Sequence, residues 1–160
     1  MLSPRPEGLQ TVSDKDPTPN AKNRRSLYLL ARRNHPLEFL QVFDFPVIQV
    51  NCTRRINSAT PLQSLTLLND EFMVEGGKSL ADRILATAEQ QTPAKWIEAA
   101  YLFALSRKPT SAELKDCVEN IEKEKQIYLN VNTDPKQAER AALGIFCQML
   151  MGTNEFLFVD

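Results

Sequence analysis

The 160-residue chain contains a single histidine, His35, and three cysteines, Cys52, Cys117 and Cys147. The cysteines lie too far apart for a CxxC pair, a zinc knuckle or a CxxCH haem attachment. A catalytic pair of serine or cysteine with histidine would have to use His35, which precedes a proline in an expected loop. We therefore expect no catalytic residue, no metal site and no cofactor in this chain.

Long apolar runs are also absent from the sequence. No stretch approaches the ~18 apolar residues of a membrane span, so we expect no transmembrane segment. The first ten residues, MLSPRPEGLQ, lack the continuous apolar region of a secretory signal peptide. Glycines number five against ten prolines, a balance that favours frequent helix starts and few flexible hinges.

Charge is distributed unevenly although the net charge is only -1. Residues 1–60 contain nine Lys/Arg and five Asp/Glu, whereas residues 61–160 contain ten and fifteen. The two parts can neutralise each other within one fold or bind an acidic partner. Because no lysine-rich tail or aromatic platform accompanies the arginines, the first interpretation is favoured and we expect no nucleic-acid binding.

The N-terminal part of the chain carries weaker signals than the rest. Residues 1–22 are rich in Pro, Ser, Thr and Asp, which predicts a flexible or surface-lying segment before a single α-helical domain over 23–160. Residues 24–34 have an ambiguous period, for which we favour a short helix over a strand. A second short helix is expected over 36–44, and residues 45–53 are β-branched and strand-like.

From Thr60 onward the helix signals are strong. Thr60, Pro61 and Gln63 match a capping box, with a hydroxyl cap, proline at the first helical position and glutamine three residues after the cap. We expect the helix cap to explain these residue types better than a ligand-binding role. The leucines of this run are expected to belong to the core, and Leu62, Leu65 and Leu68 follow one another at helical spacing.

Further helix starts follow at short intervals. Asn69 and Asp70 are expected to cap the next helix, and later starts are predicted at Thr92-Pro93, Thr110 and Asp134-Pro135. Gly76-Gly77 interrupts one helical pattern, which indicates tight packing of another element there. Gly152 is a natural helix stop. After it, three large side chains are expected to be buried: Phe156, Leu157 and Phe158.

These signals predict an all-α fold. Each apolar stripe must bury against another helix, so we expect a compact bundle of about four to six helices with an irregular N-terminal tether.

The arginine pairs are not explained by helix caps. Planar guanidinium groups suit bidentate recognition of carboxylates or phosphates, although internal ion pairs with acids such as Asp44 or Asp70 are favoured over ligand binding. Our hypothesis is a polar cluster at the helix ends, made of Arg24, Arg25, Arg54, Arg55, Asn69, Asp70 and Glu155.

Four ordered blocks carry a family resemblance: NRRSLYLLARRN, VFDFP, CTRRINSATPLQSLTLLND and NEFLFVD. Together they resemble a C-terminal domain of unknown function from large planctomycete cytochrome-associated proteins, over about Asn23 to Asp160. The resemblance implies an exported context and a terminal module that follows another domain. It places any haem c in a separate domain of the parent protein, and it implies no catalytic residues.

Two functions are compatible with these observations. The first is a non-catalytic interaction or structural module of a larger exported protein, with the parent's other domains or a protein partner as its partner. The alternative is part of a hydrolytic or redox enzyme whose active site is shared with an upstream domain. An exposed apolar patch favours the first, and a concave polar pocket favours the second.

Overall fold

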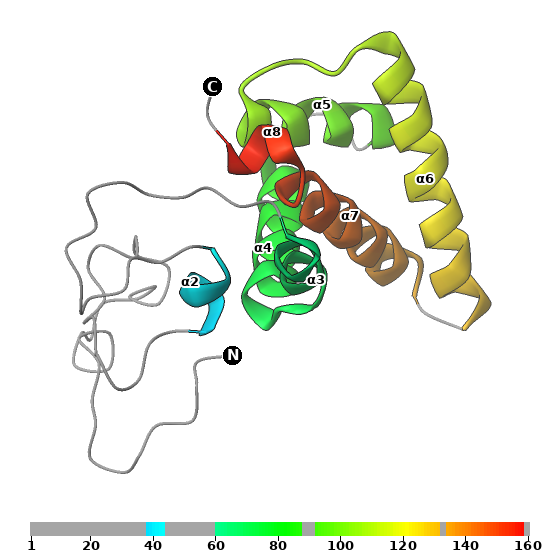
Figure 1. Ribbon diagram of the computed structural model, residues 1–160. Coiled ribbons are helices and arrows are strands. Elements are labelled where there is room, and N and C mark those ends of the chain that lie inside the picture. The colour runs from blue at the N-terminus through cyan, green and yellow to red at the C-terminus, as the bar shows by residue number, and fades with distance from the viewer. Residues whose placement is uncertain (1–37, 44–59, 88–91, 132–133, 159–160) are drawn as a thin grey trace, which may run out of the picture. The chain divides into compact units, whose positions relative to one another are not determined.

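The computed structural model describes residues 38–43, 60–87, 92–131 and 134–158 (Figure 1). All regular elements in these residues are helices, which confirms the predicted all-α fold. None of these helices is long and apolar enough to cross a membrane. The seven helices are α2 (Glu38–Val42), α3 (Pro61–Asn69), α4 (Glu71–Thr87), α5 (Pro93–Leu105), α6 (Ser111–Asn130), α7 (Pro135–Met151) and α8 (Asn154–Leu157).

The described residues belong to two units, one ending at Gln63 and the other beginning at Ser64. Several sequence predictions lie outside the described residues. They are the N-terminal tether with its boundary after residue 22, the helix over 24–34 and the strand over 45–53.

The first unit contains α2 and the start of α3. Phe39 of α2 and Phe43, the residue after α2, pack with their ring centroids 5.0 Å apart. The Gln63 side chain, 7% exposed, donates from Nε2 to the carbonyl oxygen of Val42 at 3.0 Å. A buried amide is therefore satisfied by the free carbonyl at the end of a short helix.

The helix starts of the second unit follow the sequence signals, with one exception. Thr110 and Glu113 form a capping box at α6, with the Glu113 amide donating to Thr110 Oγ1 and the Thr110 amide donating to Glu113 Oε2. At α7 the Asp134 carboxylate accepts from the amides of Lys136 and Gln137. The Thr92 side chain makes no cap hydrogen bond, so α5 begins on its proline alone.

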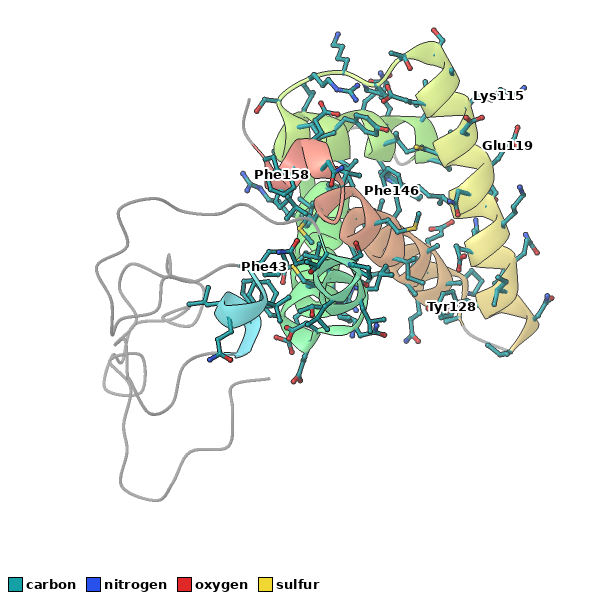
Figure 2. The ribbon with its side chains drawn as sticks, viewed as in Figure 1. Phe43, Lys115, Glu119, Tyr128, Phe146 and Phe158 are labelled. Carbon is teal, nitrogen blue, oxygen red and sulfur yellow. The ribbon has the colours of Figure 1, made fainter. Side chains whose placement is uncertain are left out.

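Helices α4, α5, α6 and α7 enclose one apolar core (Figure 1). Figure 2 places Phe146 on the side of α7 that faces α5 and α6, whereas Lys115 and Glu119 point outward from α6. The largest fully buried side chains are Ile84, Ile97, Ile121, Leu143 and Cys147.

Helices α4 and α7 approach each other closely at Gly77. A Cβ atom on Gly77 would lie 2.7 Å from the carbonyl oxygen of Gly144 and 3.0 Å from Cβ of Gln148. Only glycine fits at position 77 without moving the backbone of α7. The tight packing predicted at Gly76-Gly77 is confirmed, and Gly77 is the residue that requires it.

The leucines of α3 do not lie where the sequence predicted. Leu62, Leu65 and Leu68 are 57%, 57% and 60% exposed, so their assignment to the core is wrong. The buried leucine of α3 is Leu67, and the Gln148 side chain of α7 donates to the carbonyl oxygens of Leu67 and Leu68 at 3.2 and 2.8 Å. This anchor turns the Leu67 side of α3 inward and its other leucines outward.

The burial expected at the C-terminus is also wrong. Phe156 and Phe158 are 39% and 43% exposed, and α8 contains no buried residue. A helix of four residues offers too little surface to bury two aromatic rings against α5 and α7.

Gly77→Ala should lower the free energy of unfolding by about 1–3 kcal/mol, because overpacking against the α7 backbone outweighs the gain in helix propensity. Gly144→Ala is the matched control, since a Cβ there meets only ordinary contacts, the nearest being Lys78 Cγ at 3.7 Å. It should be neutral or stabilising by up to about 1 kcal/mol. Urea unfolding followed by circular dichroism measures both, and equal stability of the two variants would contradict the close-approach argument.

Candidate functional site

The arginines of the hypothesised polar cluster lie outside the described residues: Arg24, Arg25, Arg54 and Arg55. Their approach to the other members of that cluster stays a prediction.

Asn69 and Asp70 lie at the junction of α3 and α4, where each bonds to nearby backbone. Asn69 donates from Nδ2 to the Leu65 carbonyl oxygen at 2.9 Å, and Asp70 accepts from the Phe72 amide at 2.9 Å. The Asp70 carbonyl oxygen also accepts from the amide of Met73, so Asp70 occupies the cap position of α4.

Thr60 and Gln63 make the two reciprocal hydrogen bonds of a capping box. The Thr60 amide donates to Gln63 Oε1 at 3.1 Å, and the Gln63 amide donates to Thr60 Oγ1 at 3.4 Å.

Among the described residues, Glu155 is paired with Arg107. Arg107, in the loop after α5, donates from Nε to Glu155 Oε1 at 2.6 Å and from Nη2 to Glu155 Oε2 at 2.8 Å. The same guanidinium donates from Nη1 and Nη2 to the carboxylate of Glu113, at 3.0 and 2.8 Å. Arg107, Glu113 and Glu155 therefore form one ion-pair cluster, which we call the Arg107 cluster.

The guanidinium of Arg107 uses all of its donors. Four N–H groups bond the two carboxylates and the fifth donates from Nη1 to the Lys108 carbonyl oxygen at 3.2 Å. An arginine side chain has five such donors. Arg107 is saturated within its own domain, and it joins the end of α5, the start of α6 and α8.

Local structure holds the cluster in place. Ser106 ends α5 in the left-handed conformation, with φ 56° and ψ 20°, and so turns the chain at Arg107. Glu113 is fixed by the capping box at Thr110. The Tyr101 ring lies under the guanidinium, 5.1 Å from Cζ of Arg107 to the ring centroid.

The electrostatics follow from this geometry. Hydrogen bonds from Arg107, and then those from Thr110, lower the pKa of Glu113 to about 2. Hydrogen bonds from Arg107 also lower the pKa of Glu155, while the charge of Glu113 opposes that shift. The two carboxylates raise the pKa of Arg107. All three groups are therefore charged at neutral pH.

A buried phenol and a thiol lie beside the cluster. Tyr101 Oη is 3.8 Å from Cys117 Sγ, and burial raises the pKa of both groups. Burial also raises the pKa of Cys147 to about 12. Neither thiol is the thiolate that nucleophilic chemistry at pH 7 needs. Among the described residues, no three His, Cys, Asp or Glu side chains are grouped so that they could hold a metal ion.

Sequence reasoning missed Arg107 because its partners are six and 48 residues away. A local signal was present, since Arg107 stands three residues before the Thr110 capping box and one turn of chain can return its side chain to Glu113.

The helices and the saturated ion-pair cluster define an all-α domain. The model of the family PSD1, a protein of unknown function (DUF1553), matches residues 3–121. The chain belongs to this family, which confirms the expected domain of unknown function. Arg107 and Glu113 lie inside the matched residues and Glu155 lies beyond them. Neither a curated protein nor a solved structure gives a significant match to the chain.

Replacement of Arg107 by glutamine should raise the pKa of Glu113 from about 2 towards 4.5, because the largest stabiliser of its charged form is lost. The pKa should stay below 4.5, since the Thr110 bonds remain. In the wild type a lowered folded-state pKa means stability present above about pH 4.5 and lost as the pH falls towards 2.

Carboxylate titration by NMR measures this change. Asp82 is the control, because its pKa is lowered by Arg140 and should not respond to Arg107→Gln. An unchanged Glu113 pKa in the variant would refute the assigned cause.

Proposed function

We propose that this domain is a non-catalytic interaction module of a larger exported protein, and that α3 presents the contact surface. The observation that carries the proposal is the pair Leu65 and Leu68, which are 57% and 60% exposed on a helix without a charged residue. Isolated exposed leucines are common, but two on one face of an uncharged helix are typical of a binding surface.

The anchoring of α3 supports this proposal. The Gln148 amide bonds the last carbonyl oxygens of α3, and Leu67 is 5% exposed on the opposite side. The buried side of α3 is thus held against α7. Binding a partner to the exposed leucines would therefore lose little conformational entropy of the helix.

The Arg107 cluster supports the same proposal in another way. Its guanidinium has all five donors satisfied and its two carboxylates are charged, so this ion-pair cluster is engaged within the fold. A catalytic carboxylate usually needs a raised pKa to act as an acid, whereas both pKa values here are lowered.

The partner we propose is another domain of the parent protein. The resemblance to planctomycete cytochrome-associated proteins supplies this context, together with export from the cytoplasm and a haem c carried by a separate domain. We further propose that the domain does not bind nucleic acid.

Leu65→Asp with Leu68→Asp should reduce binding to the remainder of the parent protein by about tenfold or more, because two charges would be buried at the contact. Co-purification and isothermal titration with the separately expressed remainder measure the loss. The free energy of unfolding of the domain should change little, since both positions are exposed.

Leu102→Asp is the matched control, at an exposed leucine of α5 that is 49% exposed. It should bind as the wild type does. Equal binding by the α3 variant and the wild type would overturn the proposal. The alternative of a shared active site predicts a different result. Catalysis would then appear only in the complete parent protein and would be lost when polar residues of this domain are substituted, and that result would replace the interaction-module proposal.

Retention on heparin tests the nucleic-acid statement. With a net charge of -1 and a pI of about 5.9, the chain should elute at or below about 0.15 M salt. Retention well above that concentration would contradict it.

A further inference from the structure

Arg107 presents two hydrogen-bonding edges to two different carboxylates. The Nη1/Nη2 edge meets Glu113, which is six residues away and belongs to the α6 capping box. The Nε/Nη2 edge meets Glu155, which is 48 residues away on α8.

The two carboxylates are held with unequal strength. Glu113 also accepts from the Thr110 amide at 2.7 Å. Glu155 has a side chain that is 48% exposed and lies in a four-residue helix with no buried residue. Two carboxylates beside one guanidinium also repel each other, and the less constrained one is the easier to remove.

Removal of Glu155 would leave Arg107 in position. Its Nη1/Nη2 edge would still bond Glu113, its Nη1 would still bond the Lys108 carbonyl oxygen, and the Tyr101 ring would still lie beneath it. The exposed Nε/Nη2 edge would then be a preorganised fork with the geometry that fits a carboxylate.

We propose that the Nε/Nη2 edge of Arg107 is a binding site for the side-chain carboxylate of an Asp or Glu from a partner protein, and that Glu155 occupies it in the free domain. Glu113 lies against the same guanidinium, so the site carries no net charge once Glu155 leaves. A singly charged carboxylate fits it better than a dianionic phosphate, whose second charge Glu113 would repel. This site adds a polar contact to the proposed interaction. It rests on the proposed function only in that the partner protein supplies the carboxylate.

Chemical rescue tests the site in the 160-residue chain. Glu155→Ala vacates the edge, and sodium acetate is the probe for a side-chain carboxylate, with sodium chloride at equal ionic strength as the reference. Acetate at about 0.5 M should raise the Tm of this variant by about 2–5 °C more than that of the wild type, for an affinity on the order of 0.1 M. It should also shift the Arg107 Nε–H resonance with saturation.

Asp82→Ala is the matched control. Arg140 binds Asp82 through the same Nε and Nη2 atoms, and both side chains are about half exposed. Among the described residues, however, Arg140 has no second carboxylate partner and no ring contact, so its guanidinium is not held in place once Asp82 is removed. Acetate should not rescue this variant. It should also fail to rescue Glu155→Ala once Arg107→Gln is added.

Two results would overturn the inference. One is an absence of acetate-specific stabilisation and of a resonance shift in Glu155→Ala. The other is an equal response in Asp82→Ala, which would mean that any exposed arginine binds acetate in this way. Either result leaves the α3 contact surface intact, since that proposal is tested by Leu65 and Leu68, and loss of partner binding there would leave acetate rescue unaffected.

Discussion

The arrangement of the second unit depends on the close approach of α4 and α7 at Gly77, where a methyl group would lie 2.7 Å from a backbone oxygen of α7. Backbones this close fix how α7 runs along α4. The course of α7 decides where Gln148 meets the carbonyl oxygens of α3, and where the chain leaves after Gly152 to form α8. Both α3 and α8 are thus connected to α7, the helix that Gly77 contacts.

The helix starts were predictable because their physics is local. The hydrogen bonds at Thr110 and Asp134 join residues two or three positions apart, and a hydroxyl or carboxylate side chain at the cap position favours one backbone geometry. Gly77 could be read as a contact point because glycine in a helix interior costs stability that another interaction must offset. The all-α fold follows from these signals.

The wrong burial predictions concern which side of a segment faces the core. Leu62, Leu65 and Leu68 have helical spacing, but the anchor from Gln148, 80 residues further on, turns Leu67 inward instead. Hydrophobic periodicity predicts an apolar face on a helix, but it does not predict which part of the protein will pack against that face. The pair of Arg107 and Glu155 was not predicted, because it depends on how α8 returns to the end of α5.

The Arg107 cluster connects three helices, and it contains one positive charge and two negative charges. One guanidinium faces two carboxylates, so the charge of Glu113 works against the ionised form of Glu155 while Arg107 favours it. Glu113 is relieved of that competition by the Thr110 hydrogen bonds, and Glu155 has no comparable second donor among the described residues. Because a bidentate edge loses little when one carboxylate replaces another, exchange costs mainly the detachment of α8, a helix with no buried residue. The asymmetry between the two carboxylates makes Glu155 the exchangeable one.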